Sequence, residues 1–169
     1  HEDEAHEDEH HHDHSGVDPH AWLDPANGKV WLDVIASALA EKDPENASQY
    51  LENAAISKAK IDTATLSIEN TIAQLQDKQF IVFHDAYQYF EKQFGLQHDM
   101  VILQDPELQP GIRKTIELQR QMNDQRPSCL LVEFDSSSDL VSTVLNGHEL
   151  KQITVDLLGS NVNSIGHAY

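Results

Sequence analysis

The sequence of 169 residues predicts an α/β fold in which a long linking helix precedes a mostly parallel βαβ lobe. Two observations carry this prediction. After residue 78, short β-prone runs alternate with helical segments, which is the pattern of βαβ units. From Pro44 to about Leu75 the chain has no further glycine or proline, and apolar residues recur at helical spacing. At 39% hydrophobic, the chain can also bury a core.

The composition excludes several classes of partner and site. Acidic residues number 29 against 11 Lys and Arg, a formal net charge of −18, whereas nucleic-acid binding relies on clustered basic side chains. No apolar run approaches the ~18 residues that a membrane span needs. The one cysteine, Cys129, excludes an internal disulfide framework and a thiolate zinc cluster. Its place in an apolar run predicts an inert thiol.

Residues 1–14 form a low-complexity tract of six histidines, seven acidic residues and one alanine. Such a tract has almost nothing to bury, so we expect it to be disordered. Imidazoles and carboxylates both offer lone pairs to Zn²⁺, and their interleaving indicates a metal-gathering loop. A solvated acidic linker and a purification tag are the alternative interpretations.

Ordered structure is expected from about residue 15, and two helix starts follow. Asp24 and Pro25 combine a typical N-cap residue with proline at the first helical position, and Asp43 and Pro44 repeat this form. A helix from Pro44 to Leu75 would be about 48 Å long at ~1.5 Å per residue. A helix of that length often bridges two lobes.

Residues 78–169 are expected to form the α/β lobe. The run that begins at Cys129 is nearly all apolar, as in a strand buried on both faces. Gly95 and Arg126-Pro127 are placed to end two of the helices. The predicted strands are Phe80–Phe83, Met100–Leu103, Cys129–Phe134 and Ile153–Val155, and the predicted helices are His84–Phe94, Gly111–Asn123 and Asp139–Leu145.

Three residues occupy positions that could hold a metal ion. His20 lies on a short, proline-flanked turn just before a helix start. His84 follows the first strand and Asp156 follows the fourth, and in open α/β sheets ligands bind at the carboxyl ends of strands. Two imidazoles and a carboxylate suit a borderline-soft cation such as Zn²⁺. Asp85 could orient a ring from outside the ligand set. Taken singly, each residue could instead cap a helix or start a turn.

Enzyme signatures are missing from the sequence. It contains no nucleophile elbow, P-loop, dinucleotide fingerprint or zincin motif, so the chain is not predicted to be an enzyme. A metallohydrolase is the alternative, and it would need a general base such as Asp85 or Glu133 beside an open metal position. His98, His148 and His167 lie in polar, loop-like contexts and are predicted to be surface residues.

Four segments resemble signature segments of the periplasmic zinc-uptake solute-binding proteins of the ZnuA type, which belong to the metal-binding cluster of ABC-transporter receptors. They are PHAWLDP at 19–25, FHDAYQYFEKQFGL at 83–96, PELQPG at 106–111 and TVDLLG at 154–159. The tract at 1–14 is similar to the charged loop of the zinc-specific branch. The resemblance implies two α/β lobes joined by one long helix, with the metal held between them.

The resemblance also implies roles for the candidate ligands. His20 would be the ligand from the end of the first lobe, and His84 the ligand from the second lobe. Asp156 matches a position that is acidic in the family and binds metal in only some members. Manganese-binding relatives tend to carry a carboxylate at the position of His84, so this histidine favours zinc.

Relative to this family, we expect the chain to be a C-terminal portion. Nothing in it matches the first lobe and its further ligand histidine, and the final helix is shortened. Residues 15–43 would then be the end of the first lobe, 44–77 the linking helix and 78–169 the second lobe. In the zinc-specific branch a tail cysteine often pairs with the one matching Cys129, which has no such partner here.

The function implied is capture of Zn²⁺ in the periplasm and its delivery to a membrane ABC permease. The alternatives are a periplasmic zinc store or chaperone that works through the tract at 1–14, and a manganese- or iron-binding member of the same receptor cluster.

Overall fold

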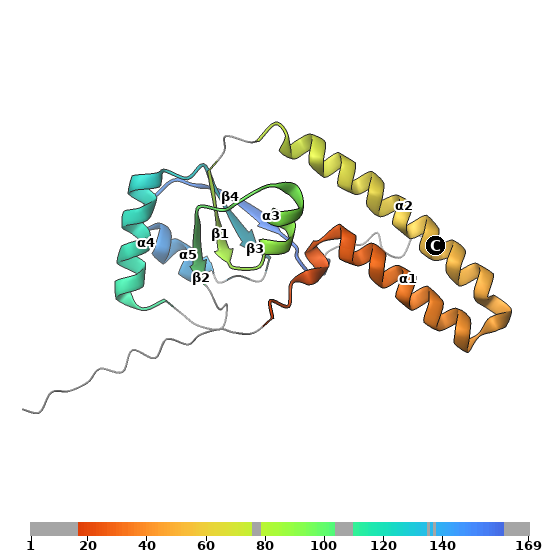
Figure 1. Ribbon diagram of the computed structural model, residues 1–169. Coiled ribbons are helices and arrows are strands. Elements are labelled where there is room, and N and C mark those ends of the chain that lie inside the picture. The colour runs from red at the N-terminus through yellow and green to blue at the C-terminus, as the bar shows by residue number, and fades with distance from the viewer. Residues whose placement is uncertain (1–16, 76–78, 104–109, 135, 137, 161–169) are drawn as a thin grey trace, which may run out of the picture.

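The structure is a computed structural model that describes residues 17–75, 79–103, 110–134, 136 and 138–160 (Figure 1). The tract at 1–14 and His167 lie outside the described residues, as does most of the segment at 106–111. No helix among the described residues combines the length and apolar character needed to cross a membrane.

The α/β lobe is built on a four-stranded, all-parallel sheet, which confirms the predicted fold class. Its strands are β1 (Phe80–His84), β2 (Met100–Leu103), β3 (Cys129–Glu133) and β4 (Lys151–Val155), in the spatial order β2-β1-β3-β4. All four predicted strands are present, with ends within two residues of those expected.

The central strand β1 is buried on both faces, as its apolar run predicts, whereas β4 is largely exposed. On one face, Ile81 and Phe83 pack in a core with residues of α4 (Ile112–Gln125) and α5 (Ser138–Leu145). On the other face, Val82 packs with Ala86 and Tyr87, next to α3 (Gln88–Phe94). Side chains of β1 therefore alternate between two apolar layers.

Two long helices project from the lobe as an antiparallel pair, α1 (Pro25–Lys42) and α2 (Ala47–Ile72) (Figure 1). The predicted cap at the start of α1 is confirmed, because the Asp24 side chain accepts a hydrogen bond of 2.8 Å from the backbone N–H of Ala26. Two ion pairs join the helices, Lys29–Asp62 at 2.7 Å and Lys58–Asp33 at 2.6 Å.

The long helix is shorter than predicted. Pro44–Asn46 form a 3₁₀ turn, η2, and α2 begins only at Ala47 and ends at Ile72. The Asp43 side chain accepts hydrogen bonds from the Asn46 amide and the Tyr50 hydroxyl, each 2.8 Å long. These local bonds stabilise the turn in place of a regular first helical turn. The 26 residues of α2 span about 39 Å.

The start of α3 also differs from the prediction. His84 is the last residue of β1, and α3 begins at Gln88. Between them, the backbone N–H of Asp85 donates to the carbonyl of Leu103 at 3.2 Å, which keeps the chain against β2 and delays the helix. Gly95 ends α3 in the left-handed conformation, with φ of 64°, as expected for a helix-ending glycine.

Candidate metal site

His20 stands immediately before η1 (Ala21–Leu23), a single 3₁₀ turn that leads into α1. Asp18, two residues earlier, holds it through one carboxylate oxygen. That Oδ1 accepts a 2.9 Å hydrogen bond from the backbone N–H of His20 and lies 2.6 Å from Nδ1 of its ring. The side chains of His20 and Asp18 are only 16% and 13% exposed, so the turn presents an oriented, largely buried imidazole.

His84 is positioned by the sheet. Val82 of β1 pairs with Leu131 of β3, so two residues further along both parallel strands His84 comes opposite Glu133. Oε1 of Glu133 lies 3.5 Å from Nδ1 of His84. The Glu133 side chain is 8% exposed, and it also accepts hydrogen bonds from the hydroxyls of Tyr87 at 2.9 Å and Ser136 at 3.0 Å.

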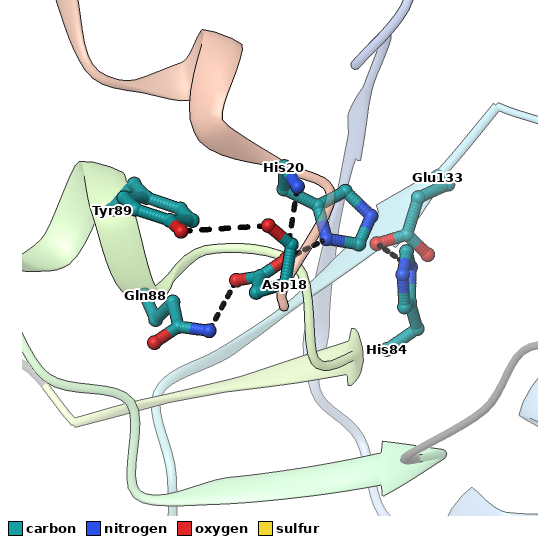
Figure 2. Close-up of polar contacts among 6 residues, drawn as sticks. All are labelled: Asp18, His20, His84, Gln88, Tyr89 and Glu133. Carbon is teal, nitrogen blue, oxygen red and sulfur yellow. Dashed lines mark hydrogen bonds and ion pairs between the residues drawn. The ribbon is translucent and has the colours of Figure 1, made fainter. Parts of the chain in front are cut away.

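The structure brings the rings of His20 and His84 together, although the residues lie far apart in the sequence (Figure 2). The ring centroids are 5.0 Å apart and the ring planes meet at 62°. Two imidazoles bound through nitrogen to one tetrahedral Zn²⁺, with Zn–N distances of about 2.0–2.1 Å, would have centroids roughly 5.2 Å apart. In both residues a carboxylate faces Nδ1, which makes Nε2 the ring nitrogen for a cation.

Asp156 follows β4 as predicted, but its side chain is engaged in hydrogen bonds within a local turn. Its Oδ1 accepts hydrogen bonds from the backbone N–H and the hydroxyl of Ser160, at 2.9 and 3.0 Å. Over the described ranges, no three His, Cys, Asp or Glu side chains are grouped so that they could hold a metal ion. The structure therefore pairs His20 with His84 without gathering Asp156 into a three-residue ligand cluster, and a role for Asp156 in metal binding stays a prediction.

The two carboxylates behind the rings are stabilised in their charged form. Burial raises the pKa of Asp18, but hydrogen bonds from His20 and Gln88 outweigh it and hold the pKa below its usual value. Burial likewise opposes the hydrogen bonds that His84, Tyr87 and Ser136 make with Glu133, and the net pKa is again lowered. Both groups are thus anionic at neutral pH and favour a proton on the ring nitrogen that faces them.

Sequence reasoning missed these two orienting carboxylates. Asp18 could have been found, because a bond from an Asp side chain to the backbone two residues later is a local pattern. Glu133 was considered only as a hydrolytic base. Glu133 makes the contact with a ligand ring that was expected of Asp85.

The predictions for the other histidines and for the cysteine had mixed outcomes. The prediction that His98 is a surface residue is wrong, because its side chain is 19% exposed and its Nδ1 lies 2.7 Å from the buried carboxylate of Glu91. His148 is half-buried rather than exposed. Cys129 is a free, half-buried thiol at the start of β3, and burial raises its pKa, in line with the predicted low reactivity.

The chain is similar to known zinc-uptake proteins over nearly its whole length. The family model described as zinc-uptake complex component A, periplasmic (ZnuA) matches residues 1–168. The high-affinity zinc uptake system protein ZnuA of Brucella abortus is 38% identical over 145 residues, which are 86% of this chain and 43% of that protein. The protein of the same name from Yersinia pestis is 31% identical, over 95% of this chain and 54% of its own length.

Solved structures give the same picture. The AdcAII protein of Streptococcus pneumoniae superposes with a TM-score of 0.70 at 28% identity, covering 83% of this chain and 53% of its own. A zinc-bound deletion mutant of ZnuA superposes with a TM-score of 0.72 at 25% identity, covering 85% and 55%. The chain spans about half the length of the relatives it matches.

Proposed function

We propose that this chain, which belongs to the ZnuA family of periplasmic zinc-uptake components, captures Zn²⁺ in the periplasm. We further propose that it delivers the ion to a membrane ABC permease. The relatives that match it are named for high-affinity zinc uptake. Because the chain corresponds to about half of those proteins, both the cargo and the permease partner are part of this proposal.

The observation that carries the proposal is the spacing of His20 and His84. Their centroid distance of 5.0 Å is close to the roughly 5.2 Å required by two imidazoles on one tetrahedral zinc ion. Each ring is backed by a carboxylate at Nδ1, the arrangement that orients histidine ligands in zinc sites. Asp156, water, or ligands outside the described residues would complete the tetrahedron.

A receptor role fits this site better than hydrolysis does. Glu133, one of the two carboxylates considered as a general base, is buried behind His84 and accepts hydrogen bonds from Tyr87 and Ser136. A carboxylate held in this way orients the ring and is poorly placed to activate a water molecule. We therefore assign no catalytic role to Glu133.

Calorimetric titration with Zn²⁺ tests the proposal. We expect the His20→Ala/His84→Ala double variant to lose the tightest binding event of the chain. His148→Ala, which removes a histidine outside the pair, should keep that event. Unchanged tight binding in the double variant would contradict the assignment.

Deletion of residues 1–14 separates the receptor from a zinc store. A receptor loses only weak, multiple sites on deletion, whereas a store loses nearly all tight binding. Competition with Mn²⁺ addresses the remaining alternative, because two imidazoles favour Zn²⁺ in the usual order of divalent-metal affinities. Preferential Mn²⁺ binding would point to the manganese-binding branch of the receptor cluster.

A further inference from the structure

Asp18 is held in place from both sides. One oxygen, Oδ1, faces His20, and the other, Oδ2, accepts a hydrogen bond from the side-chain amide of Gln88 (Figure 2). The backbone carbonyl of Asp18 also accepts a 3.4 Å hydrogen bond from the Tyr89 hydroxyl. The loop that carries His20 is therefore attached to α3 through residues about seventy positions away in the sequence.

Glu133 is held by the residue next to Gln88. The hydroxyl of Tyr87 donates to Oε1, the same oxygen that lies 3.5 Å from His84, while Ser136 donates to Oε2. Both carboxylate oxygens thus have fixed partners, and the Tyr87 side chain is itself buried. Rotation of the carboxylate away from His84 would break these bonds.

Consecutive residues at the start of α3 therefore reach two carboxylates that lie behind two different imidazoles. Tyr87 bonds to Glu133 at the end of β3, and Gln88 bonds to Asp18 in the loop before η1. The first turn of α3 joins the two halves of the candidate site into one frame.

We propose that Asp18 and Glu133 are positioning residues for the zinc ligands, and that Tyr87 and Gln88 couple them into a single preorganised unit. This inference rests on the proposed zinc-binding function. Each carboxylate fixes a proton on Nδ1 of its ring, so that the Nε2 lone pair faces the cation and the ring cannot rotate away. Loss of such an outer partner typically weakens metal binding about 10- to 100-fold.

The first test measures Zn²⁺ affinity by competition with a chelator. We expect Asp18→Ala and Glu133→Gln each to weaken binding by about 10- to 100-fold, and Asp18→Asn to lie between wild type and Asp18→Ala. Asp62→Asn and Glu117→Gln are matched controls, because each removes one exposed carboxylate with the same change in net charge, and they should bind like wild type. Wild-type affinity in both Asp18→Ala and Glu133→Gln would overturn the proposal.

A double-mutant cycle separates positioning from a general structural effect. In a His20→Ala background, Asp18→Ala should change the remaining affinity by less than about twofold, because the ring it positions is gone. An undiminished loss in that background would mean that Asp18 acts on the fold rather than on His20. Because Asp18 lies in a loop, the cycle with His20 can be interpreted even if Glu133→Gln folds poorly.

Nitrogen NMR of the histidine rings gives a readout that does not depend on zinc. In the metal-free chain we expect both rings to carry the neutral-form proton on Nδ1, and Asp18→Ala to give His20 a mixture of tautomers while leaving His84 unchanged. If the wild-type rings show no preference for Nδ1–H, the positioning proposal fails. If the tautomers are as expected but the histidine variants bind zinc normally, the proposed function fails instead.

Coupling through α3 is tested with Gln88→Ala and Tyr87→Phe. Each should weaken zinc binding, and Gln88→Ala should add little once Asp18 is already alanine. Fully additive losses would show that Gln88 acts independently of Asp18 and would remove the coupling from the proposal.

Discussion

The buried pair of Glu91 and His98 supports a prediction in which both size and pH dependence follow from the structure. Glu91 lies in α3 and is 7% exposed. Its Oε1 accepts a 2.8 Å hydrogen bond from the backbone N–H of His98 and lies 2.7 Å from Nδ1 of the ring. These contacts attach α3 to the loop that enters β2. Glu91→Gln keeps an oxygen for the backbone N–H but removes the charge that the imidazolium faces.

We expect Glu91→Gln to lower the free energy of unfolding by about 1.5–3 kcal/mol near pH ~5.5, the range for hydrogen bonds to charged groups. For a chain of this size that is a decrease in Tm of roughly 3–12 °C. The hydrogen bond that the His98 ring donates to Glu91 raises the pKa of His98 against the opposing effect of burial, and the charges of Asp85 and Asp99 add to it.

The sign of the pH dependence follows from that raised pKa. A raised pKa in the folded state stabilises the protein fully below the ordinary histidine value of 6.5, and this contribution is lost as the pH rises through the folded-state pKa. The difference between wild type and Glu91→Gln should therefore be largest at about pH 5.5. It should become smaller at alkaline pH, where the neutral ring no longer gives the Glu91 carboxylate a positive partner.

Urea unfolding at several pH values, followed by circular dichroism and tryptophan fluorescence, measures this difference. Subtracting the curves cancels the titration of groups that both proteins share. Glu117→Gln, which removes an exposed carboxylate 3.5 Å from Lys114, is the control and should cost less than about 1 kcal/mol at any pH. A difference for Glu91→Gln that is constant with pH, or that grows at alkaline pH, would refute the reasoning.

Four further substitutions test the packing and polar contacts. Leu118 of α4 is fully buried, and Leu118→Ala should leave a cavity against the sheet. We expect it to lower the free energy of unfolding, measured with urea, by about 2–5 kcal/mol. Tyr87→Phe should lower the free energy of unfolding by about 1.5–3 kcal/mol, because the buried Glu133 carboxylate loses a 2.9 Å hydrogen bond. An unchanged urea midpoint would argue against that bond. Lys29→Met and Lys58→Met should each change stability by less than about 1 kcal/mol, because the ion pairs they break are solvent-exposed.

Local signals predicted most of the fold. Three of the four strands, β1, β2 and β3, were found because strands inside a parallel sheet carry runs of apolar residues. Helix ends were found where one residue decides them, as at Asp24 before α1 and Gly95 after α3. The errors lie where a bond not visible in the local pattern decides the backbone. One is the Asp43 side chain that stabilises the turn at Pro44, and another is the Asp85–Leu103 contact that delays α3.

The candidate site was predicted only in part, for a related reason. His20 and His84 could be chosen because each stands at a position marked by the sequence, a helix entrance and a strand end. The partner of His84 could not be predicted. Glu133 lies beside His84 only because β1 pairs with β3, and these strands are neighbours in the sheet but not consecutive in the chain. Strand order is set by long-range packing, so the sequence around either residue does not contain it.

The electrostatics of the site give a physical reason for it to attract a dication. Asp18 and Glu133 are both largely buried and both ionised. Within the described residues their hydrogen bonds come from imidazoles, hydroxyls, an amide and backbone N–H groups, with no contribution from Lys or Arg. The neutral donors more than offset the effect of burial on ionisation, so both carboxylates keep their charge beside the rings. A divalent cation bound to the two rings would therefore lie close to two fixed negative charges, which favour its binding.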